Sequence, residues 1–198
     1  CSEHLPQLSK SRGIDSVTIG IAEGDRIGVV GRNGDGKSTL IKILSRQLVP
    51  DSGNVTYRGN LRVGFLTQTD VFDPELSVAK VVVGDGPEYE WAADPKIRDV
   101  LGGLVADLDW EQSVGTLSGG QLRRVALARL LAGDHGVIML DEPTNHLDVD
   151  GVNWPANHLK TRWNASSGGL LVITHDRWFL DAVCNTTWEV VSGRIEPF

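Results

Sequence analysis

The sequence GRNGDGKS at residues 31–38 restricts the possible folds of this chain more than any other feature. It matches the pattern G-x-x-x-x-G-K-[ST], follows the apolar run DRIGVV and opens the amphipathic run KSTLIKIL. A strand, a glycine-rich turn and a helix in this order surround one anion with backbone N–H groups and the positive end of a helix. The pattern therefore predicts a phosphate-binding loop within an α/β fold, made of Gly31, Arg32, Asn33, Gly34, Asp35, Gly36, Lys37, Ser38 and Thr39.

Two further apolar runs end in side chains that suit phosphate chemistry. VIMLDE places Asp141 and Glu142 at the end of one predicted strand, and VITH places His175 at the end of another. Parallel strands present their C-terminal ends at one edge of a sheet, so we expect these residues near Lys37. A single histidine is more often structural, but this placement favours a phosphate contact for His175.

This arrangement predicts metal-assisted hydrolysis of a nucleoside triphosphate. Ser38 and Asp141 are the expected Mg²⁺ ligands, and Glu142 is the expected base for the attacking water. Lys37 and His175 would stabilise the charge that develops on the transferred phosphate. Gln68, after the strand-like run VGFL, is the weakest candidate, because a single glutamine after a strand is common.

Strands and helices alternate over most of the chain, which predicts a largely parallel sheet with helices on both faces. A hairpin closed near Gly59 is expected in 54–68, and apolar residues at helical spacing in 69–114 predict a small helical insert. The other predicted strands are 17–21, 25–30, 136–140, 170–174, 187–191 and 194–196. The other predicted helices run from the glycine-rich loop to Pro50 and over 119–132, 151–163 and 176–183.

The composition limits what the chain can bind. The net charge of the 198 residues is −7, which argues against sequence-independent binding of nucleic acid through overall charge. Cys1 and Cys184 lack metal-ligand spacing and are expected to be a terminal thiol and a small core residue. The sequence has no apolar run near the ~20 residues of a membrane helix. We therefore expect a soluble, cytoplasmic protein.

The run TLSGGQLRRVALARLL at 116–131 predicts a helix that begins at a Gly-Gly pair and carries an arginine-rich outer face. A Gly-Gly start is unfavourable unless another group must approach the first backbone N–H groups closely. At this point the chain resembles the ATP-binding cassette (ABC) ATPases. LSGGQ looks like their signature sequence, and it lies between the phosphate loop and VIMLDE, as the family requires.

The resemblance covers nearly all of the chain and implies a single ABC nucleotide-binding domain over 1–198. Such a cassette has a mostly parallel core sheet, an antiparallel β subdomain and a small helical insert, here residues 69–114. In that family two domains pack head to tail, so that the signature of one closes on the γ-phosphate held by the other. The resemblance thus assigns ATP and Mg²⁺ as cofactors and a second cassette as partner. It implies nucleotide contacts for Gln68, Ser118, Gly119, Gly120 and Gln121, a role for Gln68 at the metal, and a dimer-interface role for Asp148.

The sequences DEPTNHLDVD and THDRWFLD look like those of the ABC-F subfamily. Its members have two cassettes and no membrane domains, and many act on ribosomes as translation or antibiotic-resistance factors. Asn145 and His146 carry this distinction, because transporter cassettes usually have small residues there. Trp178 and Phe179 are expected in the core. The alternatives are an ATP-binding subunit of an ABC transporter, and a nucleotide-gated binding module, against which Glu142 argues.

Two departures from the family pattern stand out. Arg12 occupies the position where the family usually has an aromatic residue against adenine, and an arginine can also stack on a base. The segment Gly13–Val17 is about four residues shorter than the resemblance leads us to expect. Because an ABC-F protein continues into a linker and a second cassette, we expect this chain to be the first cassette of a two-cassette protein.

Overall fold

The computed structural model of the chain describes residues 19–197. The expectations for Cys1, for Arg12 and for the short segment 13–17 lie outside the described residues. The structure divides into two compact units. Among the described residues, unit 1 comprises 19–65, His135–Asp141 and 163–197, and unit 2 comprises Leu66–Asp134 and Glu142–Arg162.

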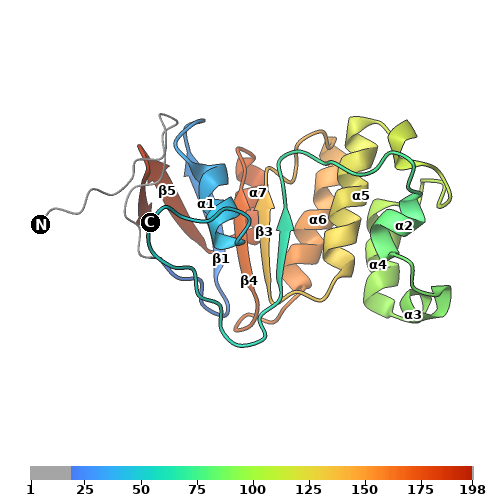
Figure 1. The fold of residues 1–198 in the computed structure, drawn as a ribbon, viewed down its shortest axis with the longest axis horizontal. Coiled ribbons are helices and arrows are strands. Elements are labelled where there is room, and N and C mark those ends of the chain that lie inside the picture. Colours follow the sequence, from blue (N-terminus) through green and yellow to red (C-terminus); the bar gives the residue numbers. More distant parts are fainter. Residues whose placement is uncertain (1–18, 198) are drawn as a thin grey trace, which may run out of the picture. The chain divides into compact units, whose positions relative to one another are not determined.

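Unit 1 is built on a six-stranded sheet with the strand order β2-β3-β4-β1-β5-β6 (Figure 1). Strand β1 pairs in parallel with β4 and β5, β3 pairs in parallel with β4, and β5 and β6 are antiparallel. The predicted fold class, α/β with a mostly parallel sheet, is therefore confirmed. The strands are β1 Arg26–Gly31, β2 Val63–Leu66, β3 Val137–Asp141, β4 Gly169–Ile173, β5 Thr186–Val191 and β6 Arg194–Pro197.

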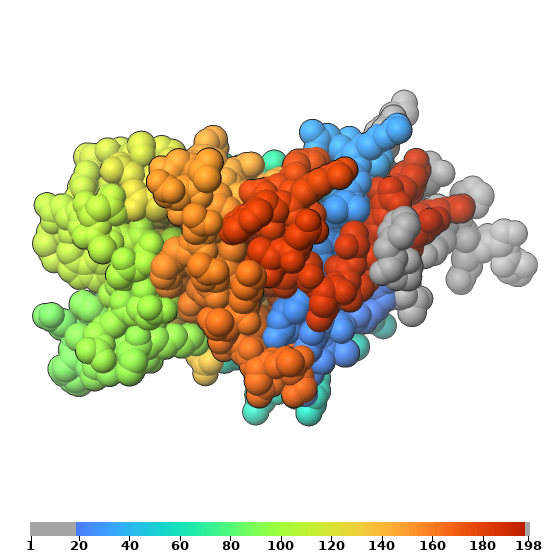
Figure 2. Space-filling view, turned by 180° about the vertical axis from the view of Figure 1, so that it is seen from behind, coloured from blue at the N-terminus to red at the C-terminus, as the bar shows by residue number. Residues whose placement is uncertain are grey.

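Helices α1 Lys37–Leu44 and α7 Arg177–Val183 cover opposite faces of this sheet. Ile27 and Val29 of β1 belong to the buried cluster that includes Leu40 and Ile41 of α1. Gly28, between them, points to the other face, where an added Cβ would lie 2.8 Å from Leu180 of α7. Figure 2, seen from behind, shows α7 in red at the molecular surface. Both faces of β1 are thus buried, as expected for a central parallel strand.

Unit 2 is helical, and α5 is its centre. Helix α5 contacts α2 and α4, and α4 contacts α6 (Figure 1). The packing of α4 on α6 depends on Gly103, because a Cβ there would lie 1.9 Å from the ring of Trp154. The helices are α2 Val78–Val83, α3 Glu88–Ala92, α4 Pro95–Leu104, α5 Gly119–Ala132 and α6 Val149–Thr161, with a 3-10 turn at Val114–Thr116.

The structure corrects three local expectations. Residues 54–58 form no strand; β2 instead lies beside β3 in the sheet, with Gly136 and Val137 donating to the carbonyl of Arg62, so the expected hairpin is not present. Helix α1 ends at Leu44, well before Pro50, because the chain enters the left-handed region at Arg46 (φ 61°). Residues 19–21 of the predicted strand 17–21 are not in a strand, and residues 17–18 lie outside the described residues.

Candidate nucleotide-binding site

The glycine-rich loop joins the central strand β1 to α1, as predicted. Gly31 ends β1, and a Cβ there would lie 2.4 Å from the carbonyl oxygen of Val190 on β5. Gly36 caps α1 in the left-handed conformation (φ 99°, ψ 13°), and no side chain caps the helix there. The first-turn N–H groups of α1 are therefore not covered by a capping side chain, which suits an anion.

Lys37 is folded back over this loop. Its ammonium group donates hydrogen bonds to the carbonyl oxygens of Gly31 and Arg32, and the residue is only 7% exposed. The Asp35 carboxylate accepts a hydrogen bond from the Arg32 amide (3.1 Å), so Asp35 stabilises the conformation of the loop to which both residues belong. A buried cation on a loop with uncapped N–H groups is the charge arrangement that a polyphosphate requires.

Two of the predicted polar residues lie at the carboxyl ends of neighbouring strands in unit 1. Asp141 is the last residue of β3, level with Ile173 of β4, and is 2% exposed. His175 follows β4 by two residues, and its Nε2 lies 3.2 Å from Oδ1 of Asn33 in the glycine-rich loop. The structure therefore brings His175 to the phosphate loop, and Asp141 ends a strand at the same edge of the sheet.

The remaining loop residues lie where the pattern placed them. Ser38 and Thr39 lie in the first turn of α1, directly after the loop, and are half-buried. Gly34 has a φ of 84°, and nothing lies within 4 Å of the position a Cβ would take. Its need for glycine is therefore conformational rather than steric.

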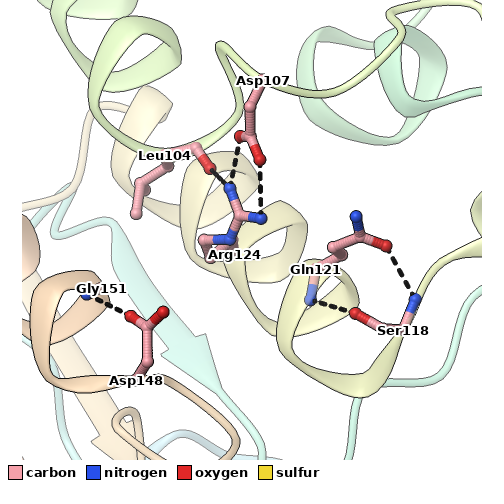
Figure 3. A network of polar contacts seen from close by, with 7 residues as sticks. All are labelled: Leu104, Asp107, Ser118, Gln121, Arg124, Asp148 and Gly151. Carbon is pink, nitrogen blue, oxygen red and sulfur yellow. Dashed lines mark hydrogen bonds and ion pairs between the residues drawn. The ribbon is translucent and has the colours of Figure 1, made fainter.

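In unit 2 the predicted signature forms the amino end of α5. The Ser118 side chain accepts a hydrogen bond from the Gln121 amide (3.2 Å), and the Gln121 side chain accepts one from the Ser118 amide (2.9 Å). Figure 3 shows this reciprocal pair, which is a capping box. Gly119 and Gly120 are the first two residues of the helix.

The two glycines differ in what surrounds them. A Cβ on Gly120 would lie 2.6 Å from the carbonyl oxygen of His146, whereas a Cβ on Gly119 would approach only the His146 ring, at 3.8 Å. From the sequence, both glycines are expected to allow the close approach of a phosphate. The structure gives Gly120 an additional reason inside unit 2, namely the close approach of the segment 142–148.

The segment 142–148 is a tightly turned connection between β3 and α6. Glu142 is buried and adopts a left-handed conformation (φ 50°), as does His146 (φ 64°). Asp148 caps α6 by accepting a hydrogen bond from the Gly151 amide at 2.6 Å (Figure 3). This cap explains why α6 begins at Val149, two residues before the predicted start. Asp148 thus has a local role whatever else it contacts.

Gln68 is an exposed residue just after β2. Its neighbours are held by Arg123 of α5, whose Nη1 donates to the Thr67 carbonyl and to the Asp70 carboxylate, each at 2.7 Å. The sequence predicts an arginine-rich outer face for this helix, and for Arg123 this prediction is wrong, since the residue is fully buried. The signal was present: Arg123 shares a helix face with Leu127 and Leu131, at i+4 and i+8.

The neighbouring Arg124 does lie near the surface. It donates to both carboxylate oxygens of Asp107 and to the carbonyl of Leu104, which ties α5 to the end of α4 (Figure 3). The hydrogen bonds from Arg124 lower the pKa of the Asp107 carboxyl.

In α7, Phe179 is buried as expected, but Trp178 is 52% exposed, so its expected core position is wrong.

A glycine-rich loop between a central parallel strand and a helix, with a lysine folded over it and a buried aspartate at a nearby strand end, defines a P-loop nucleotide-binding domain. The family profile described as "ABC transporter" matches residues 14–145. The chain belongs to the ABC transporter family, as a P-loop ATPase cassette.

Individual relatives agree with this assignment. The chain is 34% identical to the putative ATP-binding protein YdiF of Bacillus subtilis, over 93% of this chain and 35% of YdiF. It is 33% identical to the energy-dependent translational throttle protein EttA of Mycobacterium tuberculosis, over 98% of this chain and 41% of EttA. These relatives are ABC-F proteins, so the resemblance to that subfamily is confirmed, and the chain spans well under half of their length.

The fold is also that of solved cassettes. A dimeric bacterial ABC transporter cassette, MJ0796, superposes with a TM-score of 0.77 at 24% identity, over 92% of this chain and 88% of that one. At this identity the likeness establishes the fold. Within the described residues, none of the helices combines the length and apolar character needed to cross a membrane.

Proposed function

We propose that this chain binds ATP with Mg²⁺ and hydrolyses it, and that pairing with a second cassette couples hydrolysis to the control of translation. The observation that carries the ATPase proposal is Lys37 folded over the uncapped start of α1, with His175 at the same loop. The translational part is supported by the similarity to EttA, whose name describes a translational throttle.

Each residue has a proposed task in the reaction. The N–H groups of residues 31–39 and the Lys37 ammonium bind the phosphates, and Ser38 and Asp141 supply the oxygen ligands for Mg²⁺, with Gln68 as a further contact. Bound Mg²⁺ would neutralise negative charge on the phosphate oxygens. The Glu142 carboxylate takes a proton from the attacking water, whose oxygen bonds to the γ-phosphorus as the bond to the ADP oxygen breaks. His175 donates to the γ-phosphate.

The site is proposed to be completed by a second cassette. Ser118, Gly119, Gly120 and Gln121 present a second helix amino end, which would bind the γ-phosphate held by the other cassette. Asp148 would lie at that interface. We further propose that the protein works in the cytoplasm, with ribosomes as its target, as for the ABC-F subfamily that the sequence resembles.

The test replaces Glu142 by Gln, which keeps the shape of the side chain and removes the base. We expect Mg·ATP binding to be retained and hydrolysis to fall by about 100-fold or more. The natural protein carrying this change should sediment with ribosomes in the presence of ATP, because closure on ATP persists when hydrolysis is blocked. Equal hydrolysis by both forms would remove Glu142 from the mechanism. Recovery with membranes, and not with ribosomes, would favour a transporter subunit.

A further inference from the structure

Arg123 of α5 joins two segments of unit 2 that carry proposed catalytic residues. Its Nη1 donates to the Thr67 carbonyl and the Asp70 carboxylate, on the two sides of Gln68 in the chain. Its Nη2 donates to the main-chain carbonyl of Glu142, at 2.7 Å. One buried guanidinium group therefore contacts both the segment 67–70 and the residue proposed as the base.

The Glu142 carbonyl lies at a point where the backbone conformation is unfavourable. Glu142 has a φ of 50°, which lies in the left-handed region. This conformation is strained for any residue other than glycine, and it persists only where surrounding contacts stabilise it. Its carbonyl oxygen accepts a second hydrogen bond from the Asn145 amide (3.2 Å), which closes a turn. The two donors together use both acceptor positions of that oxygen.

We propose that Arg123 is a positioning residue for ATP hydrolysis: it fixes the Glu142 main chain, and thereby the direction of the carboxylate, relative to the Gln68 segment. This inference rests on the proposed function of Glu142. Because Arg123 lies on the same helix as the signature, five residues after Ser118, a displacement of that end of α5 would also reach Glu142 through the Arg123 side chain.

The chemistry of the contacts explains why an arginine is needed. A guanidinium group is planar and donates in several fixed directions, whereas a lysine ammonium is a compact point charge that cannot reproduce this fork. The ion pair with Asp70 balances the buried charge of Arg123, whose side chain is fully buried while that of Asp70 is 9% exposed. Burial raises the pKa of the Asp70 carboxyl, and Arg123 acts against that shift.

The first test compares Arg123→Lys with Arg124→Lys, the same change at the next residue of α5. We expect Arg123→Lys to lower kcat about 10-fold or more with ATP affinity changed less than about threefold, because the phosphate-binding loop is untouched. Arg124→Lys alters a surface pair with Asp107 and should leave both parameters within about twofold of the parent. An unchanged kcat for Arg123→Lys would overturn the proposal, as would an equal loss in both variants.

A double-mutant cycle separates positioning from general destabilisation. If Arg123 acts through Glu142, then Arg123→Lys should reduce hydrolysis strongly in the parent chain and add almost nothing in the Glu142→Gln background. Fully additive losses would contradict the proposal. Equal rates for the parent and Glu142→Gln would instead show that the proposed function of Glu142 is wrong, so the two failures can be told apart.

Hydrogen exchange provides a readout that does not depend on activity. In Arg123→Lys the amides of Asn145 and Leu147, which close turns onto Glu142 and Thr144, should exchange faster than in the parent. They should be unchanged in Arg124→Lys. Unaltered exchange at 142–147 in Arg123→Lys would show that the arginine does not hold this segment and would overturn the proposal, even if the variant proved less stable overall.

Discussion

At the scale of single residues, we expect the placement of charge within unit 1 to determine the affinity for phosphate. Lys37 and Lys42 both lie on α1, but Lys37 is buried against the loop carbonyls while Lys42 is exposed in the last turn. We expect Lys37→Ala to lower the affinity for ATP by about 100-fold or more, since a charge-assisted contact to phosphate is lost. Lys42→Ala should bind ATP as the parent does. Titration with a fluorescent ATP analogue measures both, and equal affinities would contradict the assignment of Lys37.

The residue scale also marks the limit of sequence-based prediction. The placement of Lys37, Asp141 and His175 could be predicted from sequence, because each lies at or just beyond the end of a predicted strand and parallel strands end at one edge. The residue type of Arg123 favours the surface, and although its helix face indicates burial, its hydrogen-bond partners could not be predicted. Its partners Thr67 and Glu142 are 56 and 19 residues away, and only the folded structure brings their carbonyl groups to one guanidinium.

At the scale of elements, the two glycines at the amino end of α5 differ in the space around them. A methyl group at Gly120 would contact the His146 carbonyl at 2.6 Å, whereas one at Gly119 has room. Alanine is the better helix former by about 1 kcal/mol, so Gly119→Ala should leave the melting temperature unchanged or raise it. We expect Gly120→Ala to lower the melting temperature, because the segment 142–148 must shift. Thermal unfolding of the two variants side by side checks this, and equal melting temperatures would contradict it.

Helix α6 contains His158, whose environment disfavours the protonated imidazole. His158 stacks on Trp154, and its Nε2 lies 3.0 Å from the Arg162 guanidinium. Burial and then Arg162 lower the pKa of His158 to about 4. The unfolded chain therefore binds a proton at this histidine at a higher pH than the folded one, and stability is lost as the pH falls from about 6.5 towards 4.

His158→Gln retains a polar side chain and removes this titration. We expect the parent chain to lose more of its free energy of unfolding than the variant between pH 7 and pH 5, because only the parent has to protonate His158 on unfolding. Denaturant titrations at the two pH values measure this difference. The same loss in both proteins would show that His158 does not titrate in that way.

The helices and strands that could be predicted well are those whose bounds depend on neighbouring residues in the sequence. Helix α5 has the predicted bounds 119–132, because Ser118 caps it and Gly133 follows it. The strand at 63–66 was recognisable, but its partner was not: the choice between 54–58 and β3 depends on contacts with a strand about 75 residues away. The end of α1 depends on the left-handed Arg46, which no residue type in that stretch indicates.

At the scale of the whole molecule, the proposed reaction needs a second cassette. The proposed γ-phosphate site joins the P-loop of one cassette to the signature of another, so trapped ATP should act as a bridge. We expect the Glu142→Gln chain to be mostly monomeric without nucleotide and to form dimers with Mg·ATP at high protein concentration. Sedimentation velocity measures the mass. The same mass with and without ATP would count against head-to-tail pairing. The control is a chain with Lys37→Ala, which is expected to bind ATP too weakly to dimerise through it.

The most direct test of the central claim, that each site is shared between two cassettes, is a mixing experiment. One chain carries Lys37→Ala and keeps its signature, and the other carries Ser118→Arg and keeps its P-loop. Each alone has no complete site, whereas a mixed pair has one, made from the intact P-loop of the second chain and the intact signature of the first. The account predicts that each variant alone is inactive and that mixing restores ATP hydrolysis. A mixture no more active than the sum of its two components would contradict it.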